Sequence, residues 1–334
     1  MTTVKRLAMA AASLMAFPAA ASAETVLLSA DHMVDVERGR LIDNPAILIE
    51  DGKIVSIGAL ASMTVPAGTE TITLDGMTIL PGLIDMHVHV WDEVELNAYL
   101  AHGVTTVRNM AGMPIHFEMV RKIGNRDMLG PRIITTGPIL NSPGPNASAN
   151  HQLVTTAEEA RAAVAQQDEA GYRHLKVYSN LTRDAYEAIL EEAAARGMTI
   201  SGHTPEGVRE DGIPFEKPFN IAFEEILDDG FITIEHMESI VWHALYDDLD
   251  DGKARALARQ LAQAGVTVDP TLLSHHALQM MAETDGAWNQ RPDSGMVNPL
   301  LLNSGRNSPP PSAATLIRSM PGPRKSSTRK GSPW

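Results

Sequence analysis

The sequence predicts an α/β protein with parallel strands, either a (β/α) barrel or an open α/β sheet. From residue 78 onward, seven strand-like segments alternate with loops and helical patterns. Strands that alternate with helices in this way usually run parallel, because each helix carries the chain back to the start of the next strand. With 334 residues, 44% of them hydrophobic and 20% charged, the chain is long enough for one barrel-sized domain or for two smaller domains with real cores.

The seven predicted strands are short apolar runs separated by turn or helix signals. They are residues 83–90, 104–108, 132–137, 174–178, 198–203, 231–236 and 266–272. Two of the helices between them are well marked, "TAEEARAAVAQQDEAG" and "TRDAYEAILEEAAARG". Each has acids in its first turn and a glycine at its end, where helix capping and the helix dipole favour these residues.

The chain ahead of these strands has a different pattern. Residues 24–77 alternate β-rich runs with turn signals, as in "AILIEDGKIVSIG". Asp51 and Gly52 in that stretch predict a two-residue hairpin turn, because both residue types tolerate a positive φ. We therefore expect a small β-sheet unit at 24–77, followed by a barrel-type domain at 78–303.

Residues 1–23 predict an export signal. Two basic residues come first, then the apolar run "LAMAAASLMAF", then the small-residue cleavage pattern "ASA". This run is too short to span a bilayer, and no later stretch approaches the roughly 20 apolar residues that spanning needs. We expect an exported protein, periplasmic or secreted, with no membrane span.

The composition changes again near residue 304. Residues 304–334 hold six of the 27 Lys and Arg and six of the 21 Pro. Prolines remove the donors that a strand needs, so this segment does not fit a buried strand. It predicts either a basic disordered tail or an out-of-frame translation.

Charge and cysteine content exclude several classes of function. The formal net charge of −14 argues against a nucleic-acid partner held through phosphates. The chain has no cysteine, so any metal must be held chiefly by histidine or carboxylate. The expected partner is a small-molecule substrate, and the protein could form a homo-oligomer.

Four of the 12 histidines stand at or next to the carboxyl ends of predicted strands, namely His87, His89, His203 and His236. Lys176 stands near the end of another. In a (β/α) barrel these ends form one mouth, so the five side chains would converge there. His87 and His89 lie two residues apart and would point to the same side of a strand, as a clamp for one metal ion.

The stretches "PGLIDMHVH", "HLKVY", "ISGHTP" and "TIEHMES" resemble the metal-binding strands of the amidohydrolase superfamily, most of all its exported prolidase-like and imidazolonepropionase-related proteins. The resemblance covers residues 24–303 and implies a TIM barrel with a small flanking β-sandwich. It implies two divalent metal ions, the first on His87 and His89 and the second on His203 and His236. Lys176 would be carboxylated and would bridge them. Imidazole and oxygen ligands suit Zn, and also Mn, Fe or Co.

The chemistry implied is hydrolysis of an amide-type C–N bond, in a dipeptide such as Xaa-Pro or in a cyclic amide. Two cations that share a hydroxide lower the pKa of the parent water and keep a nucleophile near neutral pH. His151 in the loop "GPILNSPGPNASANHQL" and Tyr178 are candidates for substrate contact, with polar packing roles as the alternative.

One feature of the superfamily is not found in this sequence. The resemblance implies an aspartate at the end of an eighth strand, and no acid follows Asp293. We therefore expect a barrel that lacks its eighth strand and a proton transfer weakened by about 10²- to 10⁴-fold. Two alternatives stay open. One is a mononuclear cyclic amide hydrolase in which Lys176 is not carboxylated, and the other is a catalytically impaired remnant that still binds metal or ligand.

Overall fold

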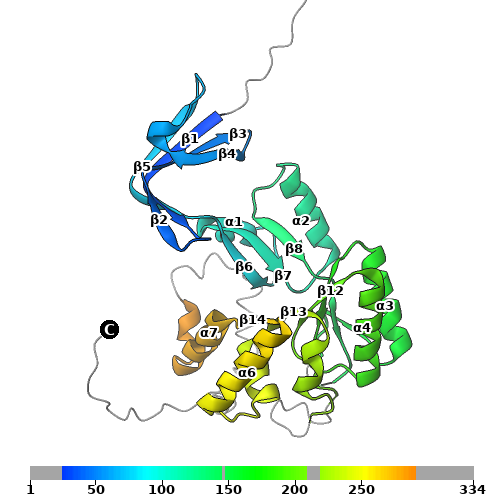
Figure 1. Ribbon diagram of the computed structural model, residues 1–334. Coiled ribbons are helices and arrows are strands. Elements are labelled where there is room, and N and C mark those ends of the chain that lie inside the picture. Colours follow the sequence, from blue (N-terminus) through cyan, green and yellow to red (C-terminus); the bar gives the residue numbers. More distant parts are fainter. Residues whose placement is uncertain (1–24, 145–146, 209–218, 291–334) are drawn as a thin grey trace, which may run out of the picture. The chain divides into compact units, whose positions relative to one another are not determined.

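The computed structural model describes residues 25–144, 147–208 and 219–290 (Figure 1). The chain divides between Pro81 and Gly82 into two compact units. The predicted export signal, the basic tail and any eighth strand lie outside the described residues. Across the described parts of the chain, every helix is too short or too polar to cross a membrane.

The first unit contains one five-stranded sheet. Its strands are β1 (Thr25–Asp35), β2 (Arg40–Asp43), β3 (Pro45–Glu50), β4 (Lys53–Ala59) and β5 (Glu70–Ile79), with the short 3₁₀ helix η1 (Leu60–Ser62). The order is β2-β1-β3-β4, and β5 runs parallel to β1. The predicted hairpin is confirmed: Glu50 pairs with Lys53, and Asp51 and Gly52 have φ of 50° and 75°. The described part of this unit shows no second sheet, so the β-sandwich stays a prediction.

The second unit is built on parallel strands. They are β6 (Leu83–Val88), β7 (Val104–Asn109), β8 (Arg132–Thr135), β9 (Ile139–Asn141), β10 (His151–Leu153), β11 (His174–Val177), β12 (Thr199–Gly202), β13 (Phe231–Glu235) and β14 (Thr267–Asp269). They form the arrays β6-β7-β8 and β10-β9-β11-β12-β13-β14, in which every pairing is parallel.

Strands β8 and β9 are successive pieces of one strand position. Between them, Thr136 N donates to Asn109 O of β7 at 2.9 Å, and Gly137 N donates to His174 O of β11 at 2.8 Å. The connecting residues therefore join the two arrays. The three-residue strand β10 is an addition that pairs with β9 on the side away from β11. The other strands occupy seven positions that follow the order of the chain, as the sequence predicted.

The seventh strand is shorter than predicted. It ends at Asp269 and not at residue 272. Pro270 has no N–H for the ladder, and Thr271 adopts a left-handed conformation with φ of 45°. Leu272 already begins a helix.

Helices connect the strands. They are α1 (Glu95–Ala101), α2 (Pro114–Gly124), α3 (Ala157–Glu169), α4 (Arg183–Arg196), α5 (Met237–Ser239), α6 (Asp251–Ala264) and α7 (Leu272–Glu283), with the shorter turns η2 (Phe223–Asp228), η3 (Ile240–Ala244) and η4 (Ala287–Gln290). The two helices marked in the sequence are confirmed as α3 and α4. The Thr156 and Thr182 hydroxyls cap them by accepting from Glu159 N and Ala185 N, and Gly197 ends α4 with φ of 64°.

The largest core of the second unit lies where α3 and α4 cover β11 and β12 (Figure 1). Leu175, Ile189 and Ile234 in this core are fully buried. A smaller core around Val88 and Val107 supports β6, β7 and α2. Parallel strands with a helix layer are buried on both faces, which explains their continuous apolar runs.

The first and last strand positions do not pair with each other. Among the described residues, β6 pairs only with β7, and β14 pairs only with β13. Residues of both strands, among them Ile84 and Val268, line one cavity of about 550 Å³. The described residues thus supply seven strand positions with a gap between the first and the seventh, and the closed eight-stranded barrel is not formed by them.

Candidate metal centre

His87 and His89 come from the end of β6. Val88 between them is buried in the small core, and β6 ends there. The two imidazole rings lie on the other side, with centroids 5.3 Å apart. The predicted pair of side chains on one side of this strand is therefore present.

Three more predicted residues converge on this pair. The His236 ring, directly after β13, lies 4.4 Å from the His87 ring and 4.3 Å from the His203 ring, which follows β12. Lys176 in β11 is 1% exposed, and its charge lowers the pKa of His87, His89 and His203. The structure thus brings together all five residues, although their role as metal ligands stays a prediction.

His236 is held in an unusual backbone conformation, with φ of 70°. Its N–H donates to Asp269 O at 2.8 Å, and its Nδ1 lies 2.8 Å from the Thr271 hydroxyl. A non-glycine residue in this region is strained by about 1 to 3 kcal/mol, and such residues cluster at functional sites. These contacts with the end of β14 hold the ring toward the other imidazoles.

Tyr178 and His151 extend the cluster. The Tyr178 ring lies 4.0 Å from the His203 ring, and the His151 ring lies 4.9 Å from the Tyr178 ring. Asn141 Nδ2 approaches His151 Nδ1 at 3.2 Å. Both residues are therefore next to the candidate metal ligands, and their contact with a substrate stays a prediction.

Three histidines of the cluster, His87, His89 and His203, have a lowered pKa, which favours the neutral ring. Burial, followed by the Lys176 charge, lowers the pKa of His87 to about 2 and that of His89 to about 4. Burial also holds the pKa of His203 well below its usual range. Neutral imidazole is the form that binds metal ions, so this environment suits a metal centre without a proton to displace.

The donor atoms fit a divalent ion. His87 Nε2, His89 Nδ1 and His203 Nδ1 are buried, and no described residue offers them a hydrogen bond. Buried polar atoms usually have such a partner. Three imidazole nitrogens without one in the same cluster therefore indicate a site for a bound ion. Imidazole is also a preferred donor for Zn and its neighbours in the first transition row.

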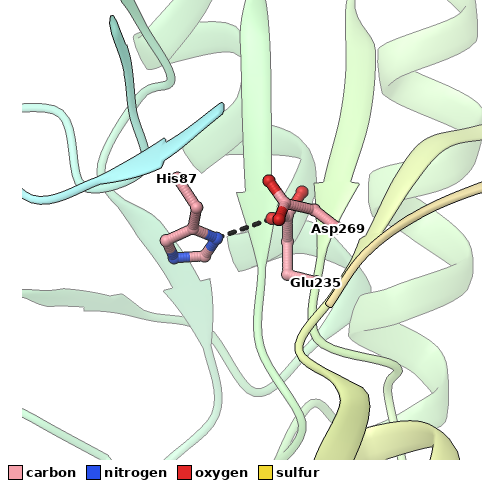
Figure 2. A group of neighbouring side chains, drawn as sticks. All are labelled: His87, Glu235 and Asp269. Carbon is pink, nitrogen blue, oxygen red and sulfur yellow. Dashed lines mark hydrogen bonds and ion pairs between the residues drawn. The ribbon is translucent and has the colours of Figure 1, made fainter. Parts of the chain in front are cut away.

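Two carboxylates that the sequence analysis did not assign complete this region. Figure 2 shows Glu235, the last residue of β13, and Asp269, the last residue of β14, facing His87. One donor atom from each of the three lies within 4.8 Å of the others, a geometry that could hold an ion. Glu235 stands near the carboxyl end of a predicted strand, so the rule that selected the histidines would also have selected it. Asp269 lay inside the predicted strand 266–272, whose end was placed three residues too late.

Comparisons with known proteins support this architecture. No family model matches the chain. An adenine deaminase of Paracoccus denitrificans is 26% identical over 193 residues, which are 53% of this chain and 32% of that protein. A dihydroorotase of Geobacter metallireducens is 38% identical over 69 residues, which are 20% of this chain and 15% of that protein. The chain therefore spans about a third or less of these curated relatives.

Solved structures share the fold. A crystal structure of a putative prolidase from Bifidobacterium longum superposes with a TM-score of 0.52 at 21% identity and covers 78% of each chain. A Xaa-Pro dipeptidase with bound methionine gives a TM-score of 0.56 at 17% identity, with 88% of this chain and 77% of that chain covered. These similarities show a shared fold, an α/β unit of parallel strands, and in this chain histidines stand at the carboxyl ends of several of them. The amidohydrolase resemblance of the sequence motifs agrees with these relatives, and membership of that superfamily stays a prediction.

Proposed function

We propose that the protein is a metal-dependent hydrolase that cleaves an amide-type C–N bond. The observation that carries this proposal is the cluster of four contacting histidine rings beside the buried Lys176, at the carboxyl ends of four parallel strands. Similarity to an adenine deaminase and a dihydroorotase supports a reaction of this class. Divalent ions bound there would supply the acidity that makes a nucleophile from water near neutral pH.

The five predicted residues would share two ions. His87 and His89 would hold the first, His203 and His236 the second, and Lys176 would lie between them. For Lys176 to bridge, its neutral Nζ must add to carbon dioxide, forming a carbamate and releasing one proton. The burial of Lys176 beside the imidazoles supports this role, because burial disfavours the charged form of an amine.

A dipeptide of the Xaa-Pro type is the first substrate class to test, because a putative prolidase and a Xaa-Pro dipeptidase share the fold. His151 and Tyr178, which follow His203 in a row of contacting rings, would contact the substrate. A cyclic amide is the second class, and the similarity to dihydroorotases favours it. Export directed by residues 1–23 would place either reaction outside the cytoplasm.

The test combines metal content with hydrolysis. The purified protein is assayed for bound metals, then for hydrolysis of Xaa-Pro dipeptides and cyclic amides, with and without a chelator. We expect two divalent ions per chain and activity that chelation removes and added Zn²⁺ or Mn²⁺ restores. Protein that binds no divalent ion and hydrolyses neither class would refute the proposal, whereas bound metal without turnover would indicate the impaired remnant.

The Lys176→Ala variant separates the binuclear form from the mononuclear one. We expect it to bind one ion or none and to lose hydrolysis. A mononuclear enzyme would keep one ion and most of its activity in this variant. Lys253→Ala is the matched control, because Lys253 is exposed and pairs with Asp248 on the surface.

A further inference from the structure

We propose that Arg108 and Glu235 are positioning residues, which fix the His87 ring so that its Nε2 faces the metal ion. Glu235 would then act through His87 without binding the ion. This inference rests on the proposed metal-dependent function and assigns roles to two residues outside the predicted ligand set. It also decides between two uses of the carboxylates shown in Figure 2.

Both oxygens of Glu235 are already engaged. Oε2 lies 2.6 Å from His87 Nδ1, and Oε1 accepts from Arg108 Nη2 at 2.6 Å and from the Thr233 hydroxyl. The side chain of Glu235 has no exposed surface. A buried carboxylate needs a close cationic partner, and the Arg108 guanidinium supplies it.

The contact with Glu235 fixes the tautomer of His87. An ionised carboxylate only accepts hydrogen bonds, so His87 Nδ1 carries the hydrogen, an assignment made from the hydrogen-bond network. In the neutral ring, Nε2 then keeps its lone pair. Nε2 is also the buried atom for which no described residue offers a hydrogen bond. A histidine that binds metal through one nitrogen and donates from the other to a carboxylate has this arrangement.

Arg108 fixes Glu235 in turn. From β7, its Nε donates to Met86 O of β6 at 2.7 Å and its Nη1 to the Thr233 hydroxyl of β13 at 2.8 Å. A guanidinium presents its donors in a rigid planar fork, so these bonds also set the direction of the bond to Glu235. These three bonds make Arg108 a structural hydrogen-bond donor that links β7 to β6 and β13.

An ion held directly by His87, Glu235 and Asp269 is less consistent with these contacts. Arg108 Nη2 lies 2.6 Å from Glu235 Oε1 and 3.7 Å from Asp269 Oδ2. A divalent cation among these oxygens would face a fixed guanidinium in a buried setting, where repulsion between like charges is weakly screened. The ion therefore belongs on the Nε2 side of His87, toward the other imidazoles.

The test measures metal binding apart from activity. Metal-free full-length protein is titrated with Co²⁺, and affinity, number of ions at saturation and visible absorption bands are recorded. Glu235→Gln should weaken affinity about 10- to 100-fold with the same number of ions and the same band positions, since the inner ligands are unchanged. Arg108→Lys keeps the positive charge but loses the planar set of guanidinium donors. It should therefore also weaken the affinity for Co²⁺.

Two controls make the result decisive. Glu225→Gln removes a carboxylate that pairs with Arg183 on the surface, and it should bind Co²⁺ as the unsubstituted protein does. His87→Ala should lower the number of ions or change the spectrum. The positioning role is overturned if Glu235→Gln behaves like His87→Ala, or if Glu235→Gln and Arg108→Lys both keep full affinity. Unsubstituted protein that binds no Co²⁺ would instead overturn the proposed function itself.

Discussion

The strands β11 to β13 and the edge strands β6 and β14 differ sharply in how they are buried. Leu175 of β11 and Ile234 of β13 are fully buried under the helix layer, whereas Leu83 and Ile84 of β6 are 54% and 62% exposed. The candidate metal centre draws on both regions. Lys176 and His203 come from the well-packed strands, but the His87 and His89 pair comes from an edge.

The two regions should therefore contribute differently to stability, although both supply residues of the candidate metal centre. The packed strands hold most of the apolar contacts, so substitutions there should change the free energy of unfolding. In the edge strand β6 only Val88 is buried, so this strand adds little packing, yet its end carries the two imidazoles that we propose as metal ligands. Its link to the packed strands is the buried network through which Arg108 and Glu235 hold Met86 O and His87.

The largest expected effect is on catalysis and comes from a substitution in the edge strand β6. His87→Ala should lower kcat/KM for the hydrolysed substrate by about 10³-fold or more, since a metal ligand worth several kcal/mol is lost. In the metal-free state its free energy of unfolding should fall by about 1 to 3 kcal/mol, because the buried Glu235 Oε2 loses the His87 ring as its partner. Steady-state kinetics and urea unfolding measure the two quantities. His102→Ala, at an exposed histidine that ends α1, is the control and should change neither. A loss of metal-free stability above about 3 kcal/mol in His87→Ala would contradict the packing difference between β6 and the strands β11 to β13.

A pair of matched core and edge substitutions tests the packing difference directly. Ile189→Ala in α4 removes a fully buried side chain and should lower the free energy of unfolding by about 2 to 5 kcal/mol. Ile84→Ala in β6 should change it by no more than about 0.5 kcal/mol, as exposed positions do. Urea denaturation of both variants gives the comparison. Equal costs would mean that β6 is covered in solution.

The pH dependence of the metal-free protein tests the electrostatics of the centre. Unfolded histidine has a pKa near 6.5, and the folded pKa is about 4 for His89 and about 2 for His87. The unfolded state therefore binds more protons below pH 6.5, and stability should fall as pH falls. Each histidine contributes up to about 1.4 kcal/mol per pH unit until its folded pKa is reached.

The groups that set the pKa of His89 are its buried surroundings, Lys176 and His151, which lower it, and Glu235, which raises it. His89→Gln removes one titrating group, so its stability should fall less steeply than that of the unsubstituted protein between pH 6.5 and 4. Thermal unfolding at several pH values in a chelating buffer measures the slopes. Parallel slopes would show that His89 titrates normally in the folded protein.

The sequence was enough to predict the seven strand positions and the five converging residues, because both depend on local patterns. Strand ends are marked by the change from apolar to polar residues, and parallel strands align these ends. The roles of Glu235 and Asp269 depend on contacts across the sheet, such as the one between Glu235 and Arg108, 127 positions apart. The early end of β14 was predictable from Pro270, but the left-handed Thr271 depends on its bond to His236.

A smaller effect should come from the cap of a helix over the packed strands. The Thr182 hydroxyl accepts from Ala185 N at 3.2 Å and donates to Thr155 O at 2.7 Å. Thr182→Ala should therefore cost about 1 kcal/mol of unfolding free energy. Thr182→Ser, which keeps the hydroxyl, should recover most of it. Equal losses in both variants would assign the effect to the methyl group and not to the cap.

The smallest effect is expected on α7, which follows the edge strand β14. No residue of α7 is buried, and Leu273 is 80% exposed. Leu273→Ser should therefore change the free energy of unfolding by less than about 0.5 kcal/mol. The measurement distinguishes two explanations for an exposed leucine on this helix. It is either a tolerated surface residue or a residue that packs against a further segment. A loss above about 1 kcal/mol would show that Leu273 packs against a further segment. The packed part of the molecule would then include α7.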